Sequence, residues 1–176
     1  MNRFKQLIIE ALANQFEGGV YIAVNVDPNN AVIKEIQSQV NRYFNLAIDI
    51  NNLHCTLIYS ANNHSSIKVS DLEIDPERVF QANIKEIKVW EGHEDNKYFG
   101  IILDSPELVN ENNRLMKFGF TSDFDSYMPH VTLQSKTNIS PNDDRLKSIN
   151  DYFKNSNHTL VLSGEYVEAL NKNWGE

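Results

Sequence analysis

The sequence contains the tetrapeptide His-x-Thr-Leu twice, in Leu53-His-Cys-Thr-Leu-Ile-Tyr-Ser60 and in Tyr127-Met-Pro-His-Val-Thr-Leu133. Each copy begins a predicted strand. Residues i and i+2 of a strand point to the same face, so each copy places an imidazole beside a hydroxyl. The intervening residues, Cys55 and Val131, are expected to face the core. The chain has five histidines, and two such tetrapeptides in matching halves are rarely produced by chance.

Around the two motifs, strand and helix patterns follow a similar order in each half of the chain. The expected strands are residues 20–26, 53–59, 80–90, 98–103, 130–134 and 159–170. The expected helices are residues 2–16, 28–40, 106–118 and 141–153. Within residues 80–90 the alternation of apolar and polar residues shifts phase, which predicts a β-bulge. This mixed order predicts an α+β fold with antiparallel sheets. No linker composition interrupts it, so we expect a single bilobal domain over residues 1–176.

Charge and cysteine content restrict the expected ligands and compartment. The chain has a net charge of −8 and no basic cluster, whereas proteins that bind a long phosphate backbone usually carry a basic stripe. We therefore expect a small nucleotide ligand and no long nucleic acid. The single cysteine, Cys55, excludes an internal disulfide and fits a cytoplasmic protein. No apolar run is long enough for a membrane span. A small acidic monomer is expected.

The paired motifs suit acid–base cleavage of a phosphodiester. One imidazole, of His54 or His130, can remove a proton from the attacking oxygen while the other supplies one to the leaving oxygen. The hydroxyls of Thr56 and Thr132 can donate to the non-bridging phosphate oxygens. The sequence leaves open which histidine is the base. The other histidines, among them His64 in a polar loop, form no such motif. No metal-binding pattern accompanies either motif, so neither a metal nor another cofactor is expected.

At these residues the chain resembles the two-histidine phosphoesterase superfamily, whose hallmark is a pair of His-x-Thr or His-x-Ser motifs. The resemblance covers residues from about 20 to 170 of the sequence. It implies a bilobal fold in which two pseudo-symmetric antiparallel sheets surround a central cleft and the helices lie outside. It also implies metal-independent action on cyclic phosphates or on 2′-5′ and 3′-5′ phosphodiesters.

Four segments are similar, more narrowly, to the phage anti-CBASS phosphodiesterases: Gly19-Val-Tyr-Ile-Ala-Val24, residues 53–60, residues 127–133, and Glu165-Tyr-Val-Glu168 with Trp174. That family degrades the cyclic oligonucleotide messengers of bacterial immunity. Its nucleotide pocket is lined by an early-strand tyrosine and by a glutamate and a tryptophan near the C-terminus. The resemblance implies these roles for Tyr21, Glu168 and Trp174. The N-terminal helix departs from the shorter members of the family.

Further residues near the motifs are candidates for the rim of the site. Lys136 follows the second motif and can offer a positive charge to a phosphate. Tyr59 and Gln134 lie in or beside the motif strands. Trp174 can either stack on a nucleobase or cover the core. Trp90, at the end of a long strand, is expected to pack between sheet and helix.

These observations predict a metal-independent phosphodiesterase that hydrolyses cyclic di- or trinucleotide messengers in the host cytoplasm. One alternative keeps the chemistry and changes the substrate to RNA ends with a 2′,3′-cyclic phosphate or to 2′-5′ oligoadenylates. Another alternative is a binding protein that sequesters nucleotides without turnover. Both His–Thr pairs are intact in this chain, which favours catalysis.

Overall fold

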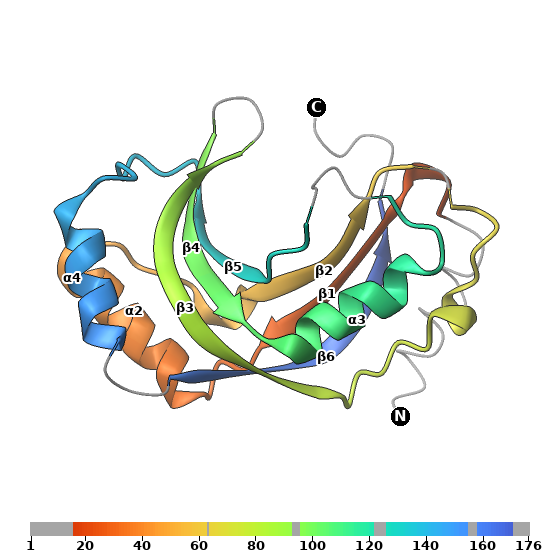
Figure 1. Cartoon of the computed structure of the whole chain (residues 1–176), viewed down its shortest axis with the longest axis horizontal. Coiled ribbons are helices and arrows are strands. Elements are labelled where there is room, and N and C mark those ends of the chain that lie inside the picture. The colour runs from red at the N-terminus through yellow and green to blue at the C-terminus, as the bar shows by residue number, and fades with distance from the viewer. Residues whose placement is uncertain (1–15, 63, 93–95, 122–125, 155–157, 171–176) are drawn as a thin grey trace.

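Six strands form one antiparallel sheet that closes on itself (Figure 1). The structure, a computed structural model, describes residues 16–62, 64–92, 96–121, 126–154 and 158–170. Residues 2–15 of the expected N-terminal helix and Trp174 lie outside the described residues. The strands are β1 (Val20–Val26), β2 (His54–Ser60), β3 (Val79–Glu91), β4 (Lys97–Asp104), β5 (His130–Ser135) and β6 (Thr159–Ala169). The helices are α2 (Ala31–Phe44), α3 (Pro106–Met116) and α4 (Asp144–Phe153), and the 3-10 turns are Phe16–Gly18, Ile50–Asn52 and Val69–Leu72.

The strand order is β1-β2-β5-β4-β3-β6, and β6 pairs back with β1. This arrangement confirms the α+β class. The two expected sheets correspond to β6-β1-β2 and β3-β4-β5, which curve apart on either side of the β2–β5 junction (Figure 1). Pairing of β2 with β5 and of β3 with β6 joins them, so they are halves of one closed sheet rather than separate sheets.

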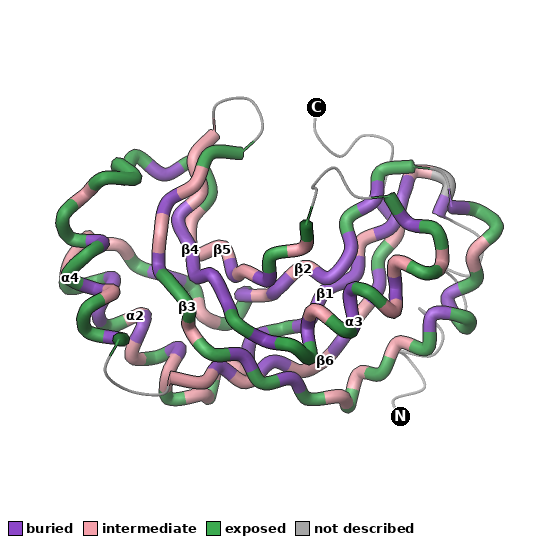
Figure 2. The backbone as a smooth tube through the Cα atoms, in the orientation of Figure 1, coloured by how far each residue is buried: buried purple, intermediate pink, exposed green. Residues whose placement is uncertain are grey.

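The core lies on the sheet face opposite the motif hydroxyls and imidazoles. A row of five side chains crosses neighbouring strands in register: Val24, Cys55, Val131, Ile101 and Ile87. All five are 0% exposed. Figure 2 shows buried residues concentrated along the strands and on the sheet-facing sides of the helices. As expected, Cys55 and Val131 are therefore part of the core.

The helices flank the sheet. Helices α2 and α4 pack against each other on one flank, and α3 contacts β2 and β3 on the other (Figure 1). Apolar residues at helical spacing, such as Ile33, Ile36 and Val40 of α2, are buried because they form the stripe that faces the sheet. Among the described residues, none of these helices has the length and apolar content needed to cross a lipid bilayer.

Of the three α-helices in the described residues, two begin directly after a capping residue rather than at the proline from which the sequence predicted their start. Pro106 occupies the first turn of α3, at the predicted helix start, and Ser105 caps the helix. By contrast, α2 begins at Ala31 rather than at the predicted residue 28, and Asn30 caps it. Helix α4 begins after Asp143 rather than at the predicted Pro141. In both cases a side-chain oxygen nearer the helix accepts the first backbone N–H groups.

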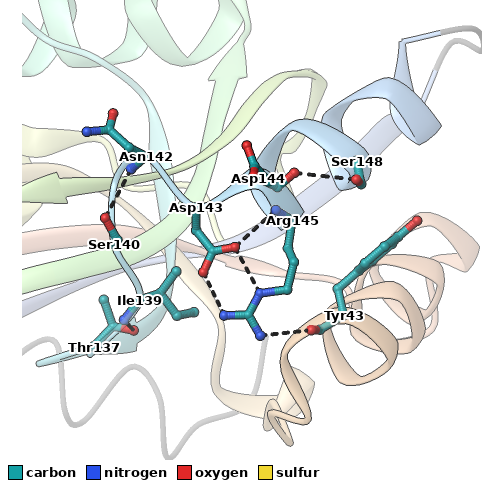
Figure 3. Close-up of polar contacts among 9 residues, drawn as sticks. All are labelled: Tyr43, Thr137, Ile139, Ser140, Asn142, Asp143, Asp144, Arg145 and Ser148. Atoms are coloured by element: carbon teal, nitrogen blue, oxygen red, sulfur yellow. Dashed lines mark hydrogen bonds and ion pairs between the residues drawn. The ribbon is translucent and has the colours of Figure 1, made fainter.

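Arg145 connects α2 and α4, the two helices on the left in Figure 1. Its guanidinium pairs with Asp143 at 2.6 Å and donates to the carbonyl of Tyr43 at the end of α2 (Figure 3). It also lies 4.7 Å from the ring centre of Phe44. The ion pair is exposed, so it contributes little to stability, but it fixes the end of α2 against the start of α4.

The predicted bulge in β3 is confirmed. The register of β3 against β4 shifts between Ile84 and Glu86. A bulge bends the strand and increases its twist, and β3 follows the strong curvature seen in Figure 1.

Candidate active site

Strands β2 and β5 place the two His-x-Thr motifs side by side. They meet at Cys55 and Val131, which are opposite each other in an antiparallel pair. In such a pair, the residue before one partner faces the residue after the other. The cross-strand neighbours are therefore His54 with Thr132, and Thr56 with His130. Since successive residues alternate between faces, all four motif side chains lie on the face opposite the core.

The burial of the motif residues follows this alternation. Cys55 and Val131 are fully buried, whereas His54, Thr56, His130 and Thr132 are all partly exposed. A ligand can reach the second set. The structure thus brings together the four residues that the sequence selects as the acid–base and phosphate-binding groups.

Both imidazoles are oriented by a backbone carbonyl two residues earlier. His130 Nδ1 lies 2.9 Å from the carbonyl oxygen of Met128. His54 Nδ1 lies 3.4 Å from that of Asn52. A carbonyl oxygen only accepts hydrogen bonds, so each ring donates from Nδ1–H. Nε2 is then the nitrogen that can exchange a proton with a ligand.

An aromatic ring packs on the edge of each histidine. The ring centres of Tyr21 and His54 are 5.9 Å apart at 89°, and those of Trp90 and His130 are 5.3 Å apart at 77°. The expectation that Trp90 packs between sheet and helix is therefore wrong. The pairing of β3 with β4 places Trp90 beside Tyr98, with which it stacks, and over the second motif.

Gly100 on β4 makes room for Trp90. A Cβ at this position would lie 2.8 Å from the Trp90 ring and 2.3 Å from the carbonyl oxygen of Val131. A glycine within an otherwise apolar strand was the available sequence signal, because such a glycine often marks close approach of another group. The glycine alone did not indicate that the approaching groups are the Trp90 ring and the Val131 carbonyl.

Tyr21 contacts the first motif through its hydroxyl as well as its ring. The Tyr21 hydroxyl lies 3.0 Å from Thr56 Oγ1. Burial raises the pKa of Tyr21 above its usual value, so the phenol remains protonated and available for hydrogen bonding. The structure thus places Tyr21 beside both His54 and Thr56.

Glu168 and Tyr166 extend this side of the site onto β6. Glu168 is opposite Tyr21 and Tyr166 is opposite Ala23, so both share the face of Tyr21. The Tyr166 ring lies 6.2 Å from that of Tyr21. Burial, and then the charge of Glu168, raise the pKa of Tyr166. Tyr166 was not among the expected site residues, although its spacing of two from Glu168 placed both on one strand face.

The remaining candidates lie along or just beyond the two motif strands. Tyr59 is opposite Tyr21 on β2 and is 43% exposed. Lys136 is exposed just beyond β5, with a left-handed backbone (φ 55°). Gln134 lies on β5 opposite Phe99 and is partly exposed. The structure places these residues along the motif strands without joining them to the His–Thr cluster.

His64 lies in the loop after β2, as expected, but its side chain is buried. It is 8% exposed, and its Nε2 lies 2.7 Å from Ser60 Oγ at the end of β2. Burial lowers its pKa, which favours a neutral structural histidine. Within the described ranges, no group of three or more His, Cys, Asp or Glu side chains is arranged to hold a metal ion.

Comparison with known proteins gives a family match over most of the chain. A family model described as "Anti-CBASS protein Acb1" matches residues 18–176. The anti-CBASS protein Acb1 of Salmonella phage S16 is 27% identical over 164 residues, which are 92% of this chain and 94% of that protein. The Acb1 protein of Acinetobacter phage Ac42 is 26% identical over 161 residues, covering 92% of this chain and 97% of that protein.

Solved structures share the fold at low sequence identity. Kluyveromyces marxianus Usb1 has a TM-score of 0.51 and 11% identity, covering 85% of this chain and 93% of that one. Escherichia coli LigT complexed with 3′-AMP has a TM-score of 0.50 and 15% identity, covering 84% of this chain and 85% of that one. These neighbours show that the fold is shared, and the family match confirms the narrower resemblance to the anti-CBASS proteins.

Proposed function

This chain belongs to the anti-CBASS protein Acb1 family, and we propose that it hydrolyses cyclic di- or trinucleotide messengers by two-histidine acid–base catalysis without a metal. One observation carries the proposal. Across the β2–β5 junction, two partly exposed His–Thr pairs share one face, and each imidazole donates Nδ1–H to a carbonyl. This geometry directs two Nε2 atoms toward the same side of the sheet.

The reaction needs one proton removed and one supplied. With a scissile phosphate between the histidines, the neutral imidazole accepts the proton of the attacking hydroxyl at Nε2. The attacking oxygen bonds to phosphorus, the leaving ribose oxygen departs, and the protonated imidazole donates its Nε2–H to that oxygen. Both attack by water and attack by a ribose 2′-hydroxyl fit this scheme. Only attack by the 2′-hydroxyl passes through a cyclic phosphate.

The threonine hydroxyls support the developing charge. Thr56 and Thr132 lie beside the imidazoles on the same face and can donate to the non-bridging phosphate oxygens. The Tyr21 hydroxyl lies 3.0 Å from Thr56 Oγ1. When it donates to that oxygen, the single proton of the Thr56 hydroxyl is left to donate to the phosphate. Fixed donors of this kind lower the barrier because they need no reorganisation during the reaction.

Aromatic rings and charge favour a small nucleotide. Tyr21 and Trp90 flank the two imidazoles, and a base stacked on such a ring gains roughly 1–3 kcal/mol. The net charge of −8 disfavours a long phosphate backbone. LigT, a fold neighbour, was solved with 3′-AMP. We therefore place a cyclic oligonucleotide of the host's immune signalling in the site, with the protein acting as a monomer in the host cytoplasm.

Incubation with a panel of cyclic di- and trinucleotides in EDTA tests the proposal. Wild type should linearise at least one substrate. His54→Ala and His130→Ala should each lose about 10²–10⁴-fold in kcat. His158→Ala is the matched control, because this ring packs on Phe153 on the α4 flank, and it should retain wild-type activity.

Other outcomes distinguish the alternatives. Turnover of RNA 2′,3′-cyclic phosphates or 2′-5′ oligoadenylates alone would replace the substrate and keep the chemistry. Stoichiometric retention of intact cyclic ligand would identify a binding protein without turnover. Activity that EDTA abolishes and a divalent metal restores would contradict metal independence.

A further inference from the structure

The two motifs meet at a sparse junction. Among the described residues, β2 and β5 share a single registered pair, Cys55 with Val131. The neighbouring pairs of strands are in register over longer stretches, for example from Asn83–Asp104 to Glu91–Lys97 in β3 and β4. A ladder of one pair gives little control over the distance between strands. A further contact across this junction would therefore help to set the separation of the two imidazoles.

Tyr127 provides such a contact. Its hydroxyl donates to the Thr56 carbonyl oxygen at 2.9 Å and lies 3.6 Å from Cys55 Sγ. The ring packs against the core. Burial, and then the neighbouring Cys55, raise the pKa of Tyr127 far above its usual value, so the hydroxyl is always a donor. Tyr127 thus attaches the segment before β5 to the backbone of the first motif.

The same segment orients the second histidine. Met128 follows Tyr127 directly, and its carbonyl accepts the Nδ1–H of His130. The next residue, Pro129, is buried and accepts the backbone N–H of Leu103 on β4 at 2.9 Å. The segment is therefore fixed to β2 at one end and to β4 at the other. The Met128 carbonyl lies between these two attachments.

We propose that Tyr127 is a positioning residue, whose hydroxyl on the Thr56 carbonyl holds the two His–Thr motifs at the separation and orientation in which both reach one phosphate. The proposal rests on the proposed function. Tyr127 acts through Thr56 and Met128 rather than on the substrate. Removing the hydroxyl takes away the 2.9 Å hydrogen bond to the Thr56 carbonyl, leaving only the weak contact from Cys55 Sγ at 3.9 Å, and frees the Met128 carbonyl, and hence His130, to shift. A misplacement of about 1 Å can reduce the rate of an enzyme by about 10²-fold.

Tyr127→Phe tests this role because it removes one oxygen and keeps the ring. We expect kcat to fall about 10- to 100-fold, with KM within about twofold, because the bases still meet the same aromatic rings. Tyr152→Phe is the matched control. This substitution likewise removes a phenolic hydroxyl, which donates to the Glu35 carboxylate on the α2–α4 flank. It should leave kcat unchanged.

A spectroscopic measurement separates this proposal from the proposed function. In ¹⁵N NMR of the wild type, neutral His130 should be predominantly the Nδ1–H tautomer, and Tyr127→Phe should raise the fraction of the Nε2–H tautomer. If wild type turns over no oligonucleotide, the proposed function fails while the tautomer measurement still decides the role of Tyr127. Unchanged kcat together with an unchanged His130 tautomer in Tyr127→Phe would overturn the inference. An equal loss of kcat in Tyr152→Phe would do so as well.

Discussion

Because the carbonyls of Asn52 and Met128 each accept Nδ1–H from a histidine, both His54 and His130 can act as base or as acid at Nε2. With Nδ1–H donated to a carbonyl, the neutral ring presents a lone pair at Nε2 and the protonated ring presents an N–H there. Neither imidazole is restricted to base or acid by its tautomer. The attacking and leaving oxygens of the bound substrate then decide the roles, which accounts for the matching local geometry of the two motifs.

Trp90 is the residue-scale contact whose effect should appear in substrate binding. Trp90→Ala removes a ring that lies against His130 and stacks on Tyr98. We expect KM to rise by about tenfold or more, since base stacking is worth roughly 1–3 kcal/mol. Trp90→Phe should retain most of the affinity. Steady-state kinetics of all three proteins decide the point, and equal KM values for Trp90→Ala and wild type would exclude stacking.

At the scale of strands and helices, the local sequence pattern predicted the elements themselves but not the contacts that depend on which strands pair. The strand of residues 20–26 and the bulge in β3 follow from local sequence. The contact of Trp90 with His130 does not, because it depends on β3 pairing with β4 and β4 with β5. The starts of α2 and α4 were missed for a local reason: several residues that can cap a helix precede each one.

The fit of β4 against β5 depends on Gly100. Gly100→Ala would bring a methyl group to 2.3 Å from the Val131 carbonyl oxygen and 2.8 Å from Trp90. We expect the free energy of unfolding to fall by about 1–3 kcal/mol and the activity to drop as Trp90 moves. Urea unfolding and kinetics measure the two effects.

Gly119→Ala provides the control for Gly100→Ala. An added methyl there meets no atom within 4 Å, although the backbone φ of +89° is unfavourable for alanine. It should lower stability through the backbone alone and leave the activity unchanged. Equal effects of both substitutions on activity would show that space at Gly100 is not the cause.

At the scale of the whole molecule, a cluster of two buried glutamates and two partly exposed arginines links distant segments. Glu111 on α3 pairs with Arg78 before β3 and with Arg114, at 2.9 Å. Glu165 on β6 is 1% exposed and accepts the backbone N–H of Asp75. Burial, and then the charge of Glu111, raise the pKa of Glu165 to about 7. The folded protein therefore holds a proton on Glu165 at mildly acidic pH.

This proton makes stability depend on pH. Between the ordinary glutamate pKa of 4.5 and the folded value of about 7, the folded state binds a proton that the unfolded state lacks. The stabilisation is complete below the unfolded pKa and is lost as pH rises through the folded one, at up to about 1.4 kcal/mol per pH unit. Glu165→Gln keeps an acceptor oxygen for Asp75 and removes this dependence.

Denaturant unfolding of wild type and Glu165→Gln from pH 4.5 to 8 measures the effect. The free energy of unfolding of the wild type should decline relative to the variant as pH rises and level off above about pH 7. Groups common to both proteins cancel in the difference. Parallel curves across this range would show that Glu165 is ionised in the folded protein.

The closing strand has a consequence for when the protein becomes active. Strand β6, near the end of the chain, lies between β1 and β3 and carries Tyr166 beside Tyr21. A nascent chain that has not yet released β6 from the ribosome has both histidine motifs but two unpaired strand edges. Activity should therefore arise only after β6 has been synthesised and released, and a message cut short before residue 159 would yield a product with both histidines and no function.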